Sequence, residues 1–294
     1  MIYEDNEISA FWEKLFGEHH ERVMSLCEYY PEKNRIEFSY EEMCSSNEAM
    51  AEYVCNNASR CLRIGENYLK EEWRNQLGNR LDTPIHIGIR ELPKDRTVPI
   101  SGIRVKDNGK LVAVRGIVRK LSSVSTVISN ACYRCSVCGS DWYELQESVY
   151  CSKSLVCKSS GCKGKGLSIK LDKSKSKYID YQEGEIQECP EGLSGRRQPQ
   201  SMLFVLKMEL VSKLTVGAKV TMNSIVKIED KRETDDNTIA PLVLEVNSIE
   251  ADDTDMDEVD LTDDIVDKVM DMSKNPNIID DIAGSIATTI YGFE

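Results

Sequence analysis

Six of the eleven cysteines in this sequence lie in one short stretch, between positions 132 and 162. Four of the six form two pairs with the spacing of metal-binding turns. The pairs are Cys135 with Cys138 and Cys157 with Cys162. Such turns direct two thiolates each at one centre, and together they close a tetrahedron around Zn²⁺. Gly139 and Gly161 adjoin the pairs, where the backbone of such turns takes φ > 0. The sequence therefore predicts a structural zinc site with four sulfur ligands.

Other interpretations of these cysteines remain open. Disulfides are disfavoured, because the sequence has no recognisable signal peptide and we expect a reducing cytoplasm. A catalytic zinc keeps an open position beside an acid or a histidine, and no histidine lies in this stretch. An iron centre of the rubredoxin type has the same four-sulfur geometry. The second pair has the longer spacing, so Cys151 is an alternative ligand to Cys157, and Cys132 is expected to be a small buried apolar residue.

Charge is distributed unevenly along the chain. The formal net charge is −13, but residues 250–294 hold 14 acidic and 2 basic side chains, which leaves −1 for the rest. Residues 104–177 hold 15 basic and 5 acidic side chains, a net charge of +10. A block of this sign suits a polyphosphate partner, although a solvated surface gives the same count. No apolar run approaches the ~20 residues of a membrane helix, so we expect a cytoplasmic protein without a membrane partner.

Hydrophobic periodicity predicts an α+β chain of several domains, with helices first. Residues 4–30 and 47–77 carry apolar side chains at a spacing of 3.6 residues, which predicts one helix in each range. Gly65 is expected to break or kink the second helix, and a short strand is expected at 35–40. We assign residues 1–83 to a helical bundle, in which Cys44, Cys55 and Cys61 are core or boundary thiols.

From Pro84 onward the period changes to two, which is typical of strands. Expected strands cover 85–89, 110–120, 166–171, 178–182, 202–208, 220–229 and 239–249. Gly116 inside the second of these predicts a bulge or a tight bend. A five-stranded β-barrel of the OB-fold kind accommodates these strands around an inserted zinc segment. We place the OB-fold at 84–131 and 168–249, and the zinc-binding lobe at 132–167.

The last part of the chain carries two further features. Strands within 225–246 bracket a polar tip that is longer than a minimal hairpin loop, which predicts a projecting β-hairpin; an ordinary solvated loop is the alternative. Lys231 and Arg232 lie near the end of this tip. An acidic linker begins at residue 250, and a helix is expected over 262–272.

This order of modules resembles the N-terminal half of archaeal minichromosome maintenance (MCM) replicative helicases. The resemblance rests on five runs of sequence, at 111–118, 133–138, 181–190, 209–217 and 285–292. The last run, Ser-Ile-Ala-Thr-Thr-Ile-Tyr-Gly, is similar to the family motif that leads into an AAA+ ATPase domain. Thr288 stands where that motif has proline.

The resemblance implies a DNA-binding, ring-assembly region of a helicase that unwinds duplexes in DNA replication. It implies a homo-hexamer, paired rings joined through zinc lobes, single- or double-stranded DNA as partner, and a location at the nucleoid. The sequence holds no Gly-x-x-x-x-Gly-Lys-[Ser/Thr], so no catalytic residue is expected, and ATP would bind only to an AAA+ domain beyond residue 294. The alternatives are a stand-alone zinc/OB-fold single-stranded DNA-binding protein and an iron–thiolate redox protein.

The resemblance also implies which side chains contact DNA. Hairpin tips would converge on the channel of the ring, and the OB face would hold a strand without reading its sequence. The expected contacts are all cationic: Lys231, Arg232, Lys227, Arg119, Lys120, Arg196 and Arg197. Two family arginines that touch single-stranded DNA are missing, because this chain has Val127 and Gln200 in their places.

Overall fold

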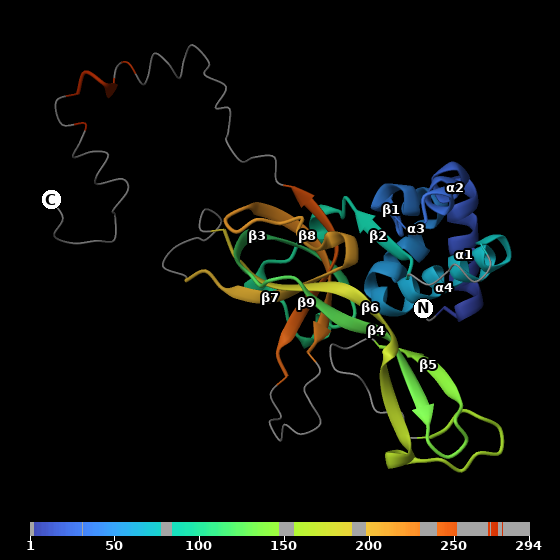
Figure 1. Ribbon diagram of the computed structural model, residues 1–294. Helices are drawn as coiled ribbons and strands as arrows, with labels where there is room; N and C mark the ends of the chain where they lie inside the picture. Colours follow the sequence, from blue (N-terminus) through green and yellow to red (C-terminus); the bar gives the residue numbers. More distant parts are fainter. Residues whose placement is uncertain are drawn as a thin grey trace. The chain divides into compact units, whose positions relative to one another are not determined.

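The computed structural model describes residues 3–30, 32–77, 84–146, 156–189, 198–229 and 240–251, and near the C-terminus 270, 272–275 and 278. Of these, 74–77 and 251 are described by their backbone alone. The chain divides into two compact units, Met1–Asp252 and Asp253–Glu294. All helices and strands named below belong to the first unit (Figure 1).

Four helices form the first part of the fold: α1 (Asp5–Glu18), α2 (His20–Glu28), α3 (Tyr40–Asn56) and α4 (Ala58–Leu77). Each of the two long helices expected from the sequence is therefore broken in two, at His19 and at Asn57. The second break has a tertiary cause, because the Ala58 N–H at the start of α4 donates to the Gly109 carbonyl in a distant turn, at 2.9 Å. Ser39 and Glu42 form a capping box that starts α3 earlier than expected, and α3 is kinked by non-helical backbone angles at Asn47, where the sequence predicted the helix start.

Gly65 does not break the helix, contrary to the prediction. It lies inside α4, where an added Cβ would come within 2.8 Å of the Trp12 ring and of the Ile87 side chain. Glycine at this position lets α4 approach α1 and the adjacent strand closely. The helices pack around a buried apolar cluster that includes Trp12, Phe38 and Trp73. Cys55 and Cys61 are buried and Cys44 is half-buried, as predicted.

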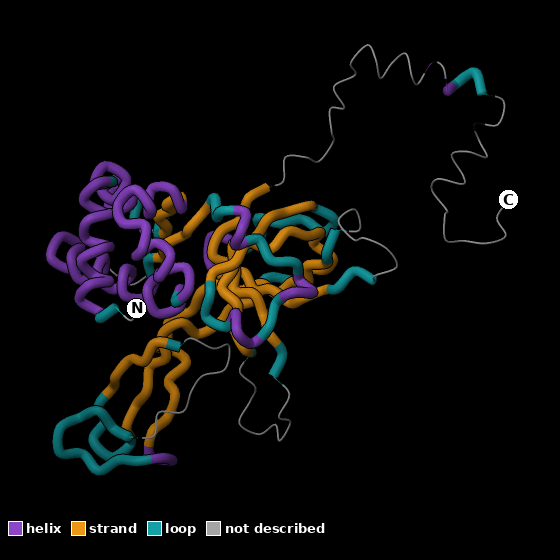
Figure 2. The backbone as a smooth tube through the Cα atoms, turned by 180° about the vertical axis from the view of Figure 1, so that it is seen from behind, coloured by secondary structure: helices purple, strands orange, loops and turns teal. Residues whose placement is uncertain are grey.

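A small parallel sheet joins the helices to the rest of the chain. It consists of β1 (Arg35–Ser39), as predicted, and β2 (His86–Arg90). The side chain of Asn247 on β9 (Leu242–Ala251) accepts from the Ile89 N–H at 2.7 Å and donates to the Ile87 carbonyl at 2.8 Å. The side chains of Asn223 and Ser248 also donate to the Ile89 carbonyl, so polar side chains take the place of a neighbouring strand at the free edge of β2. Figure 2 shows the helices gathered on one side of the larger sheet.

The larger sheet is OB-fold-like. It contains β3 (Leu111–Leu121), β8 (Lys219–Ile228), β9 (Leu242–Ala251), β7 (Ser201–Lys207) and β6 (Ile169–Gln187), hydrogen-bonded in that order. β3 also pairs with β6, so the pairings return to the first strand. Phe204, Val226 and Leu244 are fully buried among the apolar side chains of these strands.

Gly116 lies where β3 passes from one neighbour to the other. A Cβ at this position would lie 2.7 Å from the Ile186 side chain, so glycine permits the close approach of β3 to β6. The register between these strands shifts between Val118 and Lys120, near the predicted bulge.

A three-stranded stem leads away from the OB-fold-like sheet. It consists of β4 (Ser125–Cys135), β5 (Asp141–Leu145) and the first part of β6. Of the strand expected at 166–171, residues 166–168 form a 3₁₀ turn and 169–171 begin β6, which also contains the strand expected at 178–182; β4 was not expected. The predicted β8–β9 pairing is present. The hairpin tip with Lys231 and Arg232 lies outside the described residues, as do Arg196, Arg197 and most of the expected helix at 262–272.

Candidate metal centre and nucleic-acid interface

The four cysteines predicted as ligands come together at the end of the stem. Their sulfur atoms all lie within 4.8 Å of one another. The Cys135 and Cys162 sulfurs are 3.8 Å apart, and the Cys138 and Cys157 sulfurs are 3.7 Å apart. Four sulfurs bound to Zn²⁺ at ~2.3 Å would be separated by about 3.8 Å. The cluster therefore has the dimensions of a closed tetrahedral metal site. Cys151, the alternative ligand, lies outside the described residues.

Two turns position these sulfurs. Cys135 ends β4, and the N–H of Gly139 donates to its carbonyl at 2.8 Å. Gly139 has φ +75° and Gly161 has φ +79°, which confirms the left-handed conformation predicted beside each pair. Cys135 and Cys157 are buried, whereas Cys138 is exposed.

The backbone around the second pair contacts the sulfurs directly. The Ser159 N–H donates to Cys157 Sγ and the Gly164 N–H donates to Cys162 Sγ, both at 3.4 Å. A Cβ at Gly164 would lie 2.6 Å from Cys135 Sγ. Glycine at 164 is therefore required by the close approach of the backbone to the cluster. These contacts stabilise negative charge on sulfur, which a bound metal ion requires.

The pKa values of Cys138 and Cys162 are shifted in opposite directions. The Ser140 hydroxyl, and then its backbone N–H, lower the pKa of Cys138 to about 6. The Gly164 N–H lowers the pKa of Cys162, but burial and hydrogen bonds with the neighbouring thiols raise it by more, to about 12. All four donors are soft sulfurs, and the described part of the cluster offers no fifth ligand. A metal held here would be structural, since no coordination position is left for a substrate.

Cys132 does not join the cluster. Its side chain is fully buried, and its N–H donates to the Ser176 hydroxyl at 3.0 Å within the stem. This agrees with the prediction of a small buried residue.

Arg119 and Lys120 are the only two predicted DNA contacts that lie on an exposed part of the described surface. Both form ion pairs with Glu185, at 3.2 and 3.1 Å, while their side chains stay 53% and 69% exposed. The Ser201 hydroxyl, and then Lys120, lower the pKa of Glu185. One carboxylate thus faces two cations, and this end of β3 keeps an excess of positive charge.

Lys227 is placed differently. Its ammonium group binds Glu245 at 3.0 Å, and Lys207 binds the same carboxylate at 2.6 Å. Burial raises the pKa of Glu245, but the two ammonium groups lower it by more, to about 2. Lys227 is therefore part of an ion-pair network across β7, β8 and β9. The sequence around Lys227 does not indicate this pairing with Glu245.

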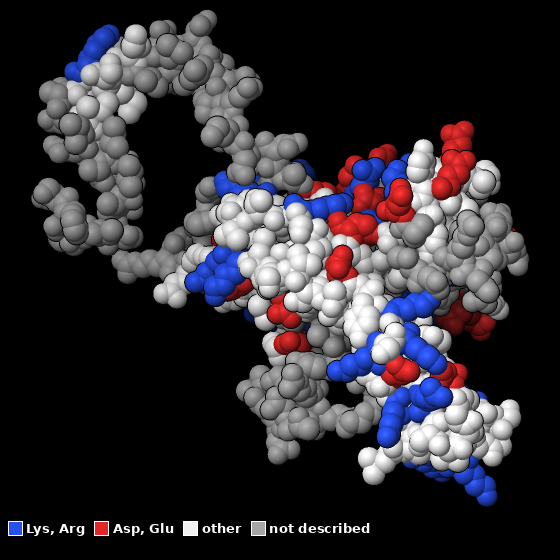
Figure 3. Space-filling model, in the orientation of Figure 1, with Lys and Arg blue, Asp and Glu red and all other residues white. Residues whose placement is uncertain are grey.

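Sequence reasoning did not single out the cations of the lobe and stem. Figure 3 shows lysine and arginine side chains gathered there. Lys158 and Lys175 form ion pairs with Glu144 and Asp141, and the exposed cations of this region include Lys163, Lys165, Lys170 and Lys173. The sequence feature that indicates these cations is the net charge of +10 over residues 104–177. No helix in the described ranges combines the length and the hydrophobicity needed to cross a bilayer.

Comparison with known proteins shows which family this architecture resembles. A family model for the MCM OB domain matches residues 99–230, a range that contains β3 to β8 and the four cysteines. This region is similar to the MCM OB domain. The solved N-terminal domain of an archaeal MCM has the same fold, with a TM-score of 0.73 and 24% identity, over 85% of this chain and all of that one.

The similarity to MCM proteins extends beyond residues 99–230. It is 29% identical over 282 residues to "Minichromosome maintenance protein MCM" of Saccharolobus solfataricus, which covers 92% of this chain and 40% of that protein. It is 26% identical over 206 residues to "DNA replication licensing factor MCM7" of Arabidopsis thaliana, which covers 68% and 29%. The chain therefore spans less than half the length of these relatives. The predicted resemblance to the N-terminal part of MCM proteins is confirmed.

Proposed function

We propose that this chain is the DNA-binding and ring-assembly N-terminal region of a replicative MCM DNA helicase. The MCM OB domain over residues 99–230, with the four-cysteine cluster inside it, carries the proposal. The proposal includes the predicted division into four parts. These are a bundle (1–83), an OB-fold barrel (84–131 and 168–249), a zinc-binding lobe (132–167) and an acidic linker with a helix (250–294). The closed cycle of strand pairings supports the barrel.

The metal in this proposal is Zn²⁺. Cys135, Cys138, Cys157 and Cys162 would hold it. Zinc supplies folding free energy to such a site, about 10–16 kcal/mol in zinc-finger peptides, and no reaction chemistry. A lobe with few buried apolar side chains depends on that contribution. Metal analysis of the purified chain should find one zinc per chain and a protein without visible colour, whereas an iron–thiolate centre would absorb visible light.

The DNA in this proposal passes through a ring of six copies, and two rings pair through their lobes. Arg119 and Lys120 at the end of β3, with Lys231, Arg232, Arg196 and Arg197, would neutralise phosphates. A ring repeats each cation six times, so affinity should fall steeply as salt rises. The sequence has no phosphate-binding loop of the Walker type, so we assign this chain no catalytic residue.

Charge reversal tests the DNA contacts. Fluorescence anisotropy with a labelled oligodeoxythymidine, measured across a salt series, gives both the affinity and the number of phosphates neutralised. Lys231→Glu with Arg232→Glu should weaken binding, and so should Arg119→Glu with Lys120→Glu. Lys14→Glu in α1 is a control that should leave the DNA affinity almost unchanged. Binding that ignores salt and both double reversals would refute the proposal.

A further inference from the structure

One sulfur of the four-cysteine cluster is open to solvent. Of the ten cysteines that the structure describes, Cys138 alone is exposed, whereas Cys135 and Cys157 are buried and Cys162 is half-buried. The whole of the turn 136–139 around Cys138 is exposed as well. Cys138 is therefore the sulfur of the cluster that a small molecule in the solvent reaches first.

The surroundings of Cys138 are polar and positively charged. The Ser140 hydroxyl lies 2.9 Å from Cys138 Sγ, within hydrogen-bond distance of a thiolate. Lys163 and Lys165 follow Cys162 on the exposed surface of the lobe, and Figure 3 shows further cations gathered on the lobe and stem. Exposed thiolates in positively charged surroundings are the cysteines that oxidants attack in proteins.

A second sulfur lies next to Cys138. The sulfurs of Cys138 and Cys157 are 3.7 Å apart, and the Ser140 hydroxyl also lies 3.7 Å from the Cys157 sulfur. The S–S distance of a disulfide is about 2.05 Å, so the two sulfurs would have to approach by about 1.7 Å. The Cys157 N–H is held by the Gly164 carbonyl at 3.0 Å. The movement therefore falls to Cys138, whose turn is exposed.

We infer that Cys138 is an oxidation site, at which hydrogen peroxide opens the metal centre. The Cys138 thiolate attacks one peroxide oxygen, the O–O bond breaks and hydroxide leaves, so that the sulfur becomes a sulfenic acid. The Cys157 thiolate then attacks this sulfur, the S–O bond breaks, and a second hydroxide leaves as the Cys138–Cys157 disulfide forms. The two thiolates together lose two electrons, and the peroxide gains them. The inference rests on the proposed function, because the same two thiolates are metal ligands in it.

Oxidation removes two of the four sulfur ligands. Cys135 and Cys162 remain, with their sulfurs 3.8 Å apart. Structural zinc sites have four protein ligands, so the oxidised lobe releases its metal ion. The folding free energy that the ion supplies is then lost as well. Reduction of the disulfide returns both thiolates, and the site can be loaded again.

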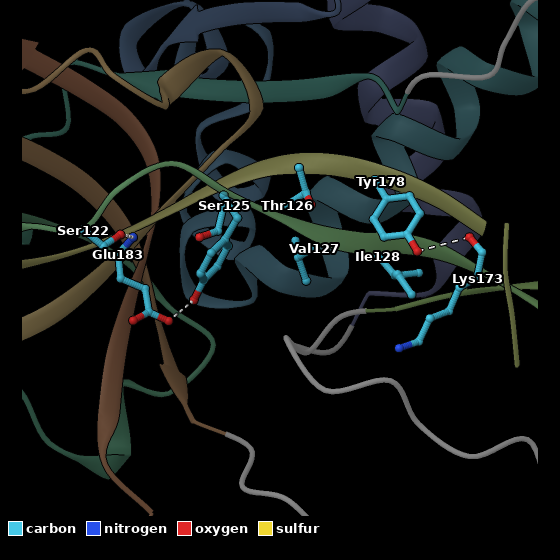
Figure 4. Close-up of a pocket in the computed structure, with 9 residues that line it drawn as sticks. Ser122, Ser125, Thr126, Val127, Ile128, Lys173, Tyr178 and Glu183 are labelled. Atoms are coloured by element: carbon cyan, nitrogen blue, oxygen red, sulfur yellow. Dashed lines mark hydrogen bonds between the residues drawn. The ribbon is translucent and has the colours of Figure 1, made fainter. Parts of the chain in front are cut away.

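The stem does not depend on the four sulfurs. The Ser176 hydroxyl accepts from the Cys132 N–H at 3.0 Å and donates to the Asp172 carbonyl at 2.7 Å. The Tyr178 hydroxyl donates to the Lys173 carbonyl at 3.1 Å (Figure 4). These bonds and the backbone pairing of β4 with β6 involve no sulfur of the cluster. Oxidation should therefore change the end of the lobe and leave the stem and the larger sheet folded.

Histidine substitutions separate the exposed sulfur from a less exposed one. Three thiolates and one imidazole also bind Zn²⁺, so Cys138→His and Cys162→His both keep four ligands. The whole zinc-loaded chain is treated with hydrogen peroxide, and a chromogenic chelator follows the release of zinc. The original chain and Cys162→His should release zinc at similar rates. Cys138→His should release it at least about tenfold more slowly, because oxidation follows the exposure of the thiolate.

Peptide mapping tests the same assignment without any substitution. After a substoichiometric amount of peroxide, tandem mass spectrometry of the original chain should find the Cys138–Cys157 disulfide as the first product. A phosphine reductant with added zinc should restore the zinc content, and circular dichroism should show the β-structure retained throughout. A first disulfide that does not include Cys138 would overturn the inference.

Failure of the inference and failure of the proposed function give different results. If the purified chain holds no zinc and takes up none, the metal centre of the proposed function fails, and the inference fails with it. If the chain holds zinc but peroxide releases none, Cys138 is not an oxidation site, and the metal centre stands. Equally fast release from Cys138→His and Cys162→His overturns the inference in the same way.

Discussion

Gly164→Ala gives the most specific perturbation of the four-cysteine cluster. The new methyl carbon would lie 2.6 Å from Cys135 Sγ and 3.4 Å from Cys162 Sγ. Carbon and sulfur atoms in ordinary contact are separated by about 3.7 Å, so the shortfall toward Cys135 is about 1 Å. A zinc site tolerates displacements of about 0.2 Å. One sulfur must therefore leave its position, or the backbone must move.

The backbone at residue 164 is not free to move. Its carbonyl accepts from the Cys157 N–H at 3.0 Å, and its N–H donates to Cys162 Sγ at 3.4 Å. Both bonds lead to other members of the cluster, so a shift that relieves Cys135 displaces them as well. Changes to groups that only support zinc ligands cost about 10- to 100-fold in metal affinity. Displacing a ligand should cost at least about 100-fold.

Competition with a chromogenic zinc chelator measures this loss, and metal analysis gives the stoichiometry. A 100-fold loss of affinity corresponds to about 2.7 kcal/mol less stabilisation by bound zinc, which a urea titration of the zinc-loaded protein would detect. Gly109→Ala is the control, because Gly109 has a left-handed backbone, φ +81°, has open space where Gly164 has the Cys135 sulfur, and lies far from the lobe in the chain. It should lower stability without changing zinc affinity. A Gly164→Ala variant that binds zinc as tightly as the original chain would refute the geometry given for this site.

Three further predictions concern the bundle and the sheet. Asn247→Ala removes both hydrogen bonds that the side chain makes to β2, and should lower the free energy of unfolding in urea by about 2–4 kcal/mol; an unchanged value would show that β2 is held by other contacts. Arg22 is the main cause that lowers the pKa of Glu42 to about 2, so the pair stabilises the fold above pH ~4.5 and loses this contribution as pH falls toward 2. The stability difference between the original chain and Arg22→Gln should therefore shrink over that range, and a constant difference would contradict the ion pair. Lys227→Met leaves Glu245 with one cation and should cost about 1 kcal/mol of stability; a loss of DNA affinity without loss of stability would instead place Lys227 on the DNA.

The parts that the sequence predicted well depend on short-range patterns. The four-cysteine cluster follows from the spacing within two turns, and the left-handed glycines follow from the same turns. The paired strands β8 and β9 follow from alternating apolar side chains on either side of a polar tip. Within each turn and within each strand, the residues that decide the local structure lie within about ten positions of one another.

The parts that the sequence did not predict depend on partners far away in the chain. Residues 173–177 of β6 alternate lysine with serine, and this segment looks like a solvated loop until β4 pairs with it. The break at Asn57 depends on the Gly109 carbonyl, and the ion pair of Lys227 depends on a neighbouring strand.

The central claim is that this chain assembles into a ring that encloses DNA. Sedimentation velocity of the whole chain at low salt, with and without labelled single-stranded DNA, tests it most directly. We predict a species of six copies, or of two such rings, that sediments together with the DNA and separates from it as salt rises. A chain that stays monomeric at micromolar concentration and sediments independently of the DNA would contradict the claim.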